Sequence, residues 1–460
     1  MSTMTAPVRE SNRITIIDSI RGVALLGILL MNIPYFANPH QFDFDLRLRN
    51  EFSGINYYTW WAVNGFFEGT MRGLFTILFG AGCILLLSRL EKKGPTISAA
   101  DIYYRRLLWL LMFGLINAYV FLWPGDILYS YAICGLFLFP FRNMKAKHLL
   151  VIAIALFTIT TAKDTWKAYS QKQMRVQGEN ALVLEKANQK LTPAQEEAKG
   201  TWIGFQEKTK VENIRKEAEG DVVKMQQNYF GVWAHLKNII VWLETTKFYS
   251  NFFLDIMLLL FLGMALFKMG VLTGQQSKGL YWVLLIAGYG IGLSLSYWRM
   301  NASLITNFDS TRYLDVVKID VYQAKRMALT LGHISFFMLL YKYNIAKNLM
   351  RWLSRVGQMA FTNYLMQSLI CTLLFYGYGF GLFGKLERYE QYYVVGAVWL
   401  FQIIFSNIWL KYYQFGPFEW LWRSLTYWKK QPMRRRKNSE DEIPDEHVIQ
   451  KEEVPSVVLT

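Results

Sequence analysis

The chain has 460 residues, of which 53% are hydrophobic and 16% aromatic, whereas charged residues make up only 18%. That charged fraction is below the roughly 25% typical of soluble domains, which argues against a soluble enzyme. The formal net charge of +16 does not indicate nucleic-acid binding, because the basic residues stand in short clusters between apolar runs rather than on a soluble module. We predict an integral membrane protein, with the lipid bilayer as partner and no nucleic-acid partner.

Ten apolar segments are candidates for membrane spans, since a span needs about 20 largely apolar residues. Backbone groups find no water in lipid, so these segments are expected to be helices. The predicted fold class is all-α: a polytopic helical bundle of about ten transmembrane helices with one helical extramembrane insert. The predicted spans are residues 14–34, 69–90, 104–122, 126–142, 147–162, 248–268, 279–298, 326–343, 356–376 and 391–411.

Lys and Arg are unevenly distributed among the loops that join these segments. If there are ten spans and both termini are cytoplasmic, the main basic clusters all fall on the cytoplasmic side. This agrees with the positive-inside rule, by which cytoplasmic loops of membrane proteins carry an excess of Lys and Arg. The loop 299–326 is an exception, since it mixes basic residues with aspartates. The clusters are Arg89, Lys92, Lys93, Arg105 and Arg106; Arg142, Lys145 and Lys147; Lys342, Lys347, Arg351 and Arg355; and Lys429, Lys430 and Arg434 to Lys437.

Residues 163–247 interrupt the membrane pattern. They are rich in Lys, Glu, Gln and Ala, which is typical of amphipathic helices outside the bilayer. Pro193 directly after Thr192 predicts the start of a helix. The predicted organisation is a first bundle of five spans (1–162), an extracytoplasmic helical insert (163–247), a second bundle of five spans (248–430) and a disordered cytoplasmic tail (431–460).

Ionisable residues inside a span are costly and suggest function by default. Asp18 and Arg21 stand at i, i+3 in the first span, either as a self-neutralising ion pair or as an anion-binding arginine held by Asp18. His333 lies in the eighth span, either as a hydrogen-bonded core group or as a general base. In the ninth span Asn363 and Gln367 share one face and either join helices or line a cavity.

Further polar residues stand near the ends of the predicted spans. Glu68 and Arg72, at i, i+4, predict an ion pair at the membrane interface. Asp126 opens the fourth span, where a carboxylate is expected at a helix N-terminus. Glu419 and Arg423 lie in a Trp-rich segment typical of a short helix at the cytoplasmic interface.

Motifs for several classes of enzyme are missing from the sequence. There is no GxxxxGK[ST], HExxH or GxSxG pattern and no Cys/His metal spacing. The three cysteines, Cys83, Cys134 and Cys371, lie in apolar runs and are expected to be buried thiols. We therefore predict no metal site and no bound cofactor.

Several ordered motifs resemble a known family. Asp18, Arg21, Gly22 and Asn32 lie in an opening that resembles the D-x-x-R-G-x-A-L-L-G-I-x-x-x-N start of the YeiB-like bacterial membrane proteins, called domain of unknown function 418. Further similar stretches are residues 72–82, 125–132, 357–368 and 416–423. The resemblance leaves out the insert and implies a multi-pass protein of the bacterial inner membrane.

The same opening is similar to that of the acyltransferase-3 proteins and the heparan-alpha-glucosaminide N-acetyltransferases. These move an acyl group from cytoplasmic acyl-CoA to an acceptor across the membrane. The resemblance implies that Asp18 and Arg21 lie near a CoA-side site. A histidine is the catalytic base in those families, but Asn32 stands where acyltransferase-3 proteins tend to have one, so the candidates are His333 and His40, which lies in the first extracytoplasmic loop.

Three functions remain open. The first is acyl transfer from acyl-CoA to a small-molecule, lipid or glycan acceptor, with His333 as base, Asn363 or Gln367 as oxyanion donor and Arg21 on a CoA phosphate. The second is a transporter or permease lined by the same groups, which the absence of an internal repeat disfavours. The third is a non-catalytic scaffold or sensor whose insert binds a protein partner.

Overall fold

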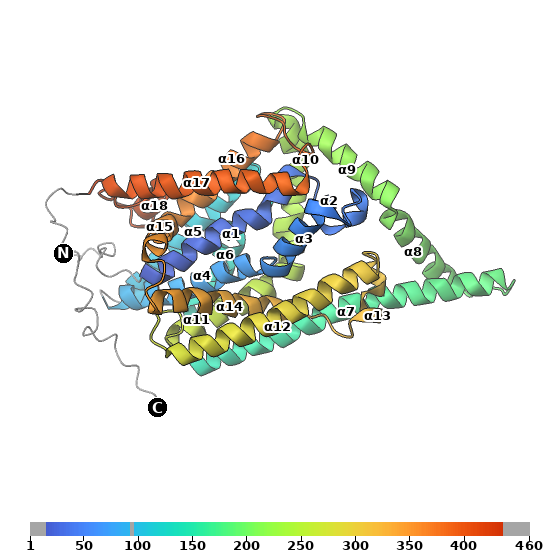
Figure 1. Ribbon diagram of the computed structural model, residues 1–460, viewed down its shortest axis with the longest axis horizontal. Helices are drawn as coiled ribbons and strands as arrows, with labels where there is room; N and C mark the ends of the chain where they lie inside the picture. The colour runs from blue at the N-terminus through green and yellow to red at the C-terminus, as the bar shows by residue number, and fades with distance from the viewer. Residues whose placement is uncertain (1–14, 93–95, 436–460) are drawn as a thin grey trace.

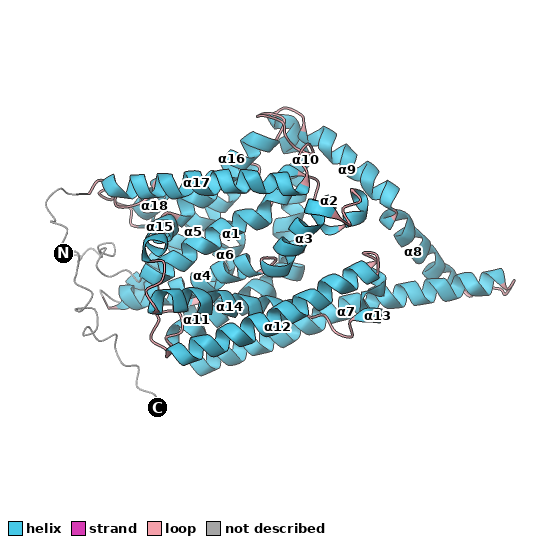
Figure 2. Cartoon of the chain, viewed as in Figure 1, coloured by secondary structure: helices cyan, strands magenta, loops and turns pink. Residues whose placement is uncertain are grey.

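A computed structural model describes residues 15–92 and 96–435. The secondary structure of these residues is helical, without a β-strand (Figure 1, Figure 2). The predicted all-α class is therefore confirmed. Most of the predicted tail, from residue 436 onward, lies outside the described residues.

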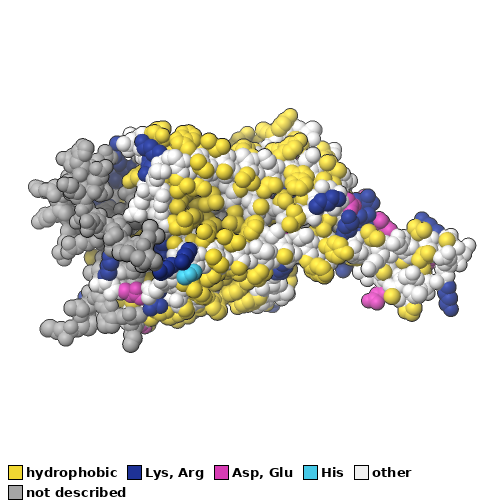
Figure 3. All heavy atoms as spheres, turned by 90° about the horizontal axis from the view of Figure 1, so that it is seen from below, with side chains coloured by type: hydrophobic (Ala, Val, Ile, Leu, Met, Phe, Trp, Pro, Cys, Tyr) yellow, Lys and Arg dark blue, Asp and Glu magenta, His cyan; other side chains and the backbone are white. Residues whose placement is uncertain are grey.

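Six helical segments of the described chain are long and apolar enough to cross a membrane. Figure 3 shows a broad belt of hydrophobic side chains around the middle of the molecule, with Lys and Arg toward its two ends. A soluble protein rarely exposes an apolar surface of this extent, so the chain is a multi-pass membrane protein. The six segments are Thr15–Ala37, Gly54–Glu91, Ala146–Lys186, Tyr229–Lys268, Lys278–Ile305 and Arg388–Tyr412.

Eight of the ten predicted spans overlap a single long helix. The 41-residue α7 runs well beyond its predicted end at 162, and α11 continues the π-helix Leu243–Phe252. The eight helices are α1 (Thr15–Ala37), α4 (Thr70–Glu91), α5 (Thr96–Tyr119), α7 (Ala146–Lys186), α11 (Phe253–Lys268), α12 (Lys278–Ile305), α14 (Tyr322–Lys342) and α17 (Arg388–Tyr412).

The fourth and ninth predicted spans are not single long helices. The fourth contains only the nine-residue α6 (Leu128–Leu136) and a 3-10 turn, about 14 Å of α-helix at 1.5 Å per residue. Pro140 stands in that turn and opposes continuation of an α-helix. The ninth is divided at Met359 into α15 (Lys347–Gln358) and α16 (Ala360–Phe375). The count of ten spans is thus not confirmed.

The insert forms an arm that projects from one end of the bundle (Figure 1). The arm consists of residues 163–186 of α7 and of α8 (Pro193–Thr209), and α9 (Val211–Met225) leads back to the bundle at α10 (Tyr229–Trp242). The Thr192 hydroxyl and the Gln195 side chain form a reciprocal capping box at the start of α8, so the predicted helix start at Pro193 is confirmed. We call this end of the bundle the arm end, and the opposite end, where Arg105 and Arg142 lie, the basic end.

Helix α1 lies in the bundle and packs against α4, α15, α16 and α17. It meets α15 at two glycines: a Cβ on Gly22 would lie 2.1 Å from the Leu353 carbonyl oxygen, and a Cβ on Gly357 would lie 1.9 Å from the Asp18 carbonyl oxygen. Small residues let helix backbones approach in this way within membranes. The shorter helices, α2 (Gln41–Phe44), α3 (Gly54–Phe66), α13 (Tyr313–Val316) and α18 (Pro417–Thr426), lie at the two ends.

Alanine at Gly357 should force α1 and α15 apart, because its methyl group has no room beside Asp18. Overpacking of this kind costs about 1–3 kcal/mol. We expect a lower midpoint of thermal unfolding for the purified Gly357→Ala protein in detergent. Gly82→Ala in α4 is the matched control, since nothing lies within 4 Å of its Cβ position. Equal midpoints for the two variants would contradict the close contact.

Candidate functional sites

The first candidate site lies at the basic end of α1. The Arg21 guanidinium donates to the Asp18 carboxylate over 2.6 Å, and the side chains are 28% and 11% exposed. The backbone of Asp18 is held against α15 by the contact with Gly357. The predicted i, i+3 pair is present, and Arg21 keeps part of its surface accessible.

A second arginine, Arg106 of α5, lies within electrostatic range of Arg21. Its guanidinium carbon is 3.8 Å from the centroid of the Trp422 ring, and the Trp422 indole donates to the Arg106 carbonyl over 2.9 Å. Among the described residues no carboxylate lies within ion-pair distance of Arg106. We call Asp18, Arg21, Arg106 and Trp422 the basic-end site, in which Arg21 pairs with Asp18 and Arg106 has the Glu419 carboxylate within electrostatic range.

Glu419 of α18 borders this site and holds α16. Its carboxylate accepts from the amides of Phe361 and Thr362, over 2.7 and 3.0 Å, and from the Thr362 hydroxyl. Burial raises the pKa of Glu419, and these donors oppose that shift. The short helix predicted around Glu419 is confirmed as α18. The Arg423 guanidinium lies 4.4 Å from the centroid of the Phe415 ring.

The second candidate site lies at the arm end, around Asp255 of α11. The Arg326 guanidinium donates to both Asp255 carboxylate oxygens, over 2.6 and 2.8 Å. Arg72 of α4 donates to the same carboxylate over 3.2 Å, and Gln323 over 3.0 Å. Asp255 and Arg326 are buried, so one carboxylate joins three helices of the bundle.

Glu68 extends this site toward α12. It forms ion pairs with Lys325 of α14 and with Arg299 of α12, the latter over 3.3 Å. The predicted ion pair between Glu68 and Arg72 is therefore wrong. Gly69 stands between them at φ 77° and α4 begins only at Thr70, so the two side chains do not share one face of a helix.

These residues form one charged group, which we call the arm-end cluster: Glu68, Arg72, Asp255, Arg299, Lys325 and Arg326. Four cations face two carboxylates within ion-pair distance. Lys325 and Arg326 are sealed from solvent, whereas about a third of the Arg72 and Arg299 side chains is exposed. The Nε atom of Arg326 is buried without a hydrogen-bond partner.

His333 is fully hydrogen-bonded in the bundle. Its Nε2 lies 3.1 Å from the Phe66 carbonyl oxygen, and its Nδ1 lies 2.8 Å from the Tyr289 hydroxyl. A carbonyl oxygen only accepts, so Nε2 carries the hydrogen and Nδ1 accepts from Tyr289. This geometry favours the predicted alternative of a satisfied core histidine.

Asn363 and Gln367 join α16 to α17. Asn363 donates to the Ser406 hydroxyl and Gln367 to the Gln402 side-chain oxygen, each over 2.9 Å. Gln402 donates in return to the Asn363 carbonyl over 2.8 Å. No hydrogen bond within the described part of the chain connects either residue with His333, so the contacts favour the helix-joining alternative.

The remaining predicted residues lie at different places. Asp126 accepts from the Tyr129 amide over 2.8 Å and so caps α6, as predicted. Its carboxylate also accepts from Asn117 and from the Tyr364 hydroxyl. Asn32 is partly exposed on α1 and His40 is exposed before α2. Cys83, Cys134 and Cys371 are buried free thiols.

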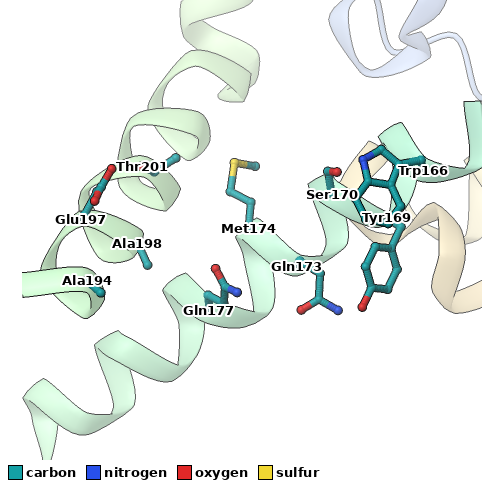
Figure 4. A pocket seen from close by; sticks show the side chains of 10 residues that line it. All are labelled: Trp166, Tyr169, Ser170, Gln173, Met174, Gln177, Ala194, Glu197, Ala198 and Thr201. Carbon is teal, nitrogen blue, oxygen red and sulfur yellow. The ribbon is translucent and has the colours of Figure 1, made fainter. Parts of the chain in front are cut away.

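A groove of about 450 Å³ lies outside both sites, between α7 and α8 of the arm (Figure 4). Trp166, Tyr169 and Met174 of α7 face Ala198 and Thr201 of α8 across it. None of the predicted site residues lines this groove. In residues 15–92 and 96–435 there is also no group of three or more His, Cys, Asp or Glu side chains that could hold a metal ion.

Sequence reasoning missed Arg106, Asp255 and Arg326 as members of sites. Asp255 lies inside the apolar run 248–268, and Arg326 opens the eighth predicted span. The rule that an ionisable residue in a span suggests function would have found both. Arg106 lies near the start of the third predicted span, 104–122, but its charge is interpreted there only as part of the basic cluster of the preceding loop.

The fold and the two sites define a multi-pass helical membrane protein with charged groups inside each end of its bundle. Residues 266–429 match the family model described as Protein of unknown function (DUF418). "Uncharacterized protein YxaH" of Bacillus subtilis is 30% identical over 442 residues, covering 94% of this chain and 98% of its own. The chain belongs to this YeiB-like DUF418 family, as its motifs predict.

Two further relatives also match over most of this chain and most of their own length. "Uncharacterized protein YeiB" of Escherichia coli is 28% identical over 418 residues, with 89% of this chain and 95% of its own covered. The "Uncharacterized 39.9 kDa protein in amylase 3'region" of Bacillus acidopullulyticus is 26% identical over 438 residues, with 94% and 99% covered. No solved structure matches the chain.

Replacing Asp255 by asparagine should destabilise the bundle strongly, because Arg326 then stays buried without a counter-charge. Removing one partner of a buried ion pair costs about 3–5 kcal/mol, which thermal unfolding in detergent would show as a large fall in the midpoint. The matched control is Asp101→Asn, which breaks the exposed pair with Arg105 and should cost at most about 1 kcal/mol. Similar midpoints for both variants would argue against a structural role of the cluster.

Proposed function

We propose that this protein is a membrane-bound acyltransferase that takes an acyl group from acyl-CoA and passes it to a small-molecule, lipid or glycan acceptor. The observation that carries the proposal is the basic-end site, where the Arg21 guanidinium pairs with Asp18 and the Arg106 guanidinium lies within electrostatic range of Arg21 without an ion pair of its own among the described residues. CoA carries phosphate groups, and the guanidinium fork is the side chain best matched to phosphate oxygens.

The construction of the basic-end site supports this proposal. Asp18 and Arg21 belong to the opening motif, and the glycine contact with α15 fixes their helix. Glu419, from the last motif, fastens α18 to the start of α16. Trp422, on the same helix, lies against the Arg106 guanidinium and orients it. A binding group needs a rigid second layer of this kind to hold its geometry.

Acyl transfer also needs a base. An acceptor hydroxyl would attack the thioester carbon, the carbon–sulfur bond would break, and the hydroxyl proton would pass through the base to the CoA thiolate. His333 is one proposed base, but Tyr289 occupies its Nδ1 lone pair. His40 is the other, and its exposed ring makes no side-chain hydrogen bond among the described residues. Asn363 or Gln367 would donate to the oxyanion only by giving up contacts with α17.

The proposal includes an orientation. We place the basic end in the cytoplasm of a bacterial cell, with both termini there, about ten crossings of the inner membrane and the arm outside. The excess of Lys and Arg at the basic end supports this orientation. Helices α5, α14 and α16, together with the short α6 and the 3-10 turn after it, would supply the four crossings beyond the six longest apolar segments.

Transport of an anionic solute is the alternative, and the arm-end cluster favours it. Buried ionisable groups within a bundle often mark the path of a substrate or ion. Uptake by proteoliposomes separates the two functions, because a transporter moves solute without acyl-CoA. An acyltransferase should release CoA only when an acceptor is present.

Loss of an arginine from the basic-end site should weaken binding of CoA to the purified protein. We expect Arg21→Gln and Arg106→Gln each to raise the dissociation constant about tenfold or more, because a hydrogen bond to a charged group contributes about 1.5–3 kcal/mol. Calorimetric titration would measure the effect. Arg142→Gln is the matched control, since Arg142 pairs with Glu91 at the same end outside the site.

Three results would speak against the enzyme. They are unchanged CoA affinity in both site variants, absence of CoA release from any acyl-CoA, and unchanged release in the His40→Asn and His333→Asn variants. Unchanged CoA affinity would contradict the proposed site for the acyl donor. Absence of CoA release would contradict the reaction, and unchanged release in the histidine variants would contradict the proposed bases.

The orientation can be tested with two single cysteines on α7 and α8. Lys147 at the basic end and Lys208 on the arm are both exposed, whereas the native cysteines are buried and give little background. A membrane-impermeant maleimide should label Lys208→Cys in intact cells, and Lys147→Cys only after the membrane is permeabilised. The opposite pattern would reverse the orientation.

A further inference from the structure

We infer that the arm-end cluster binds a phosphate monoester, carried by the acyl acceptor and entering from the arm side of the membrane. The inference rests on the proposed function for the role of this ligand as acceptor, whereas the binding itself does not depend on it. It deepens the proposal by naming the chemical class of the acceptor, a hydroxyl compound that also bears a phosphate group.

Charge is the first argument. Four cations face two carboxylates in the cluster, an excess of two positive charges. Buried charge without compensation is costly, and a doubly charged phosphate monoester would balance it. Arg326 adds a buried Nε hydrogen that has no acceptor.

Three nearby carboxylates form no ion pair with the cations of the cluster among the described residues, although Asp320 lies within electrostatic range of Arg299. Asp164 reaches the cluster only through the Gln323 amide, and Lys163 lies within electrostatic range of it. Asp320 accepts from the Tyr322 amide at the start of α14, and Asp43 pairs with Arg388. Among the described residues none of these three carboxylates lies within ion-pair distance of a cation of the cluster.

Exposure divides the cluster into a floor and a rim. Lys325 and Arg326 are 1% and 0% exposed and hold the two carboxylates, so they form the floor. Arg299 and Arg72 are 34% and 31% exposed, and each has only one long ion pair, of 3.3 and 3.2 Å. A ligand would therefore meet Arg72 and Arg299, which approach from α4 and α12.

Tyr322 supplies a third group to the rim. Its ring centroid lies 5.1, 5.8 and 5.5 Å from the cationic groups of Arg299, Lys325 and Arg326. Its hydroxyl lies against Gly69, where a Cβ would come within 2.6 Å of it. No side-chain hydrogen bond engages this hydroxyl among the described residues, and Tyr322 as a residue is partly exposed. It can donate to a phosphate oxygen bound beside Arg299.

Calorimetric titration with glycerol 3-phosphate tests the inference, with glycerol as the uncharged control. The full-length protein would be held in phosphatidylcholine nanodiscs without acyl-CoA. We expect saturable binding of glycerol 3-phosphate and none of glycerol. Arg299→Gln should weaken binding about tenfold or more and Tyr322→Phe should weaken it less, whereas Arg299→Lys should retain part of the affinity.

Arg312→Gln is the matched control, because Arg312 lies at the same end and pairs with Asp309 outside the cluster. Unchanged CoA binding by the Arg299→Gln protein would show that it is folded and that the basic-end site is separate. A second set of nanodiscs containing phosphatidic acid distinguishes the source of the phosphate. Competition by this lipid would identify a lipid acceptor, and its absence a soluble one.

Two results would overturn the inference. One is equal response to glycerol 3-phosphate and glycerol in a protein that still binds CoA. The other is an equal loss of affinity in Arg299→Gln and Arg312→Gln, which would indicate unspecific attraction to the arm end. Either result leaves the proposed CoA site intact, whereas failure of CoA binding alone would remove the acyltransferase and keep the phosphate site.

Discussion

The carboxylate of Asp255 is the point at which α4, α11 and α14 are tied together. Apolar side chains cannot hold these helices together by the hydrophobic effect alone, because lipid tails are as apolar as a leucine side chain. The bundle relies instead on close backbone contacts and on buried polar groups. Gly80 and Gly263 bring α4 and α11 into backbone contact, and Asp255 joins the same two helices at the arm end. A carboxylate with this structural role also determines where the charged side chains that pair with it can lie.

The motifs that mark the family contact one another in the folded chain. Gly22 of the opening lies against α15 near Gly357, Asp126 accepts from the Tyr364 hydroxyl, and Glu419 binds the start of α16. Each contact joins segments more than fifty residues apart. The motifs therefore specify how α1, α6, α16 and α18 meet, and the basic-end site is the place where α1 and α18 present charged or aromatic groups beside Arg106 of α5.

The two ends of the bundle differ in how they could use charge. At the basic end Arg21 pairs with Asp18 and keeps part of its surface exposed, and Arg106 forms no ion pair among the described residues, which suits a phosphate-bearing donor. At the arm end four cations face two carboxylates, and the two arginines of the rim keep part of their surface exposed. His333, Asn363 and Gln367 lie in neither group, because their hydrogen bonds are used within the bundle. A polar residue inside a span can therefore either join helices or bind a ligand. Its hydrogen-bond partners in the folded chain show which of the two it does.

Composition and hydropathy alone indicated a multi-pass membrane protein, helical segments and a polar helical insert, although the predicted insert 163–247 extends too far, since the apolar segment Tyr229–Lys268 already begins within it. They suffice because these properties depend on residues close in sequence, as do the cap of α6 by Asp126 and the start of α8 at Pro193. Tertiary structure decided which charges pair. Glu68 pairs with Lys325 and Arg299 rather than with its neighbour Arg72. Gly69 breaks the helix between Glu68 and Arg72, and helices distant in the chain bring the other two cations close to Glu68. The charge excess that makes either site a candidate exists only once those helices meet.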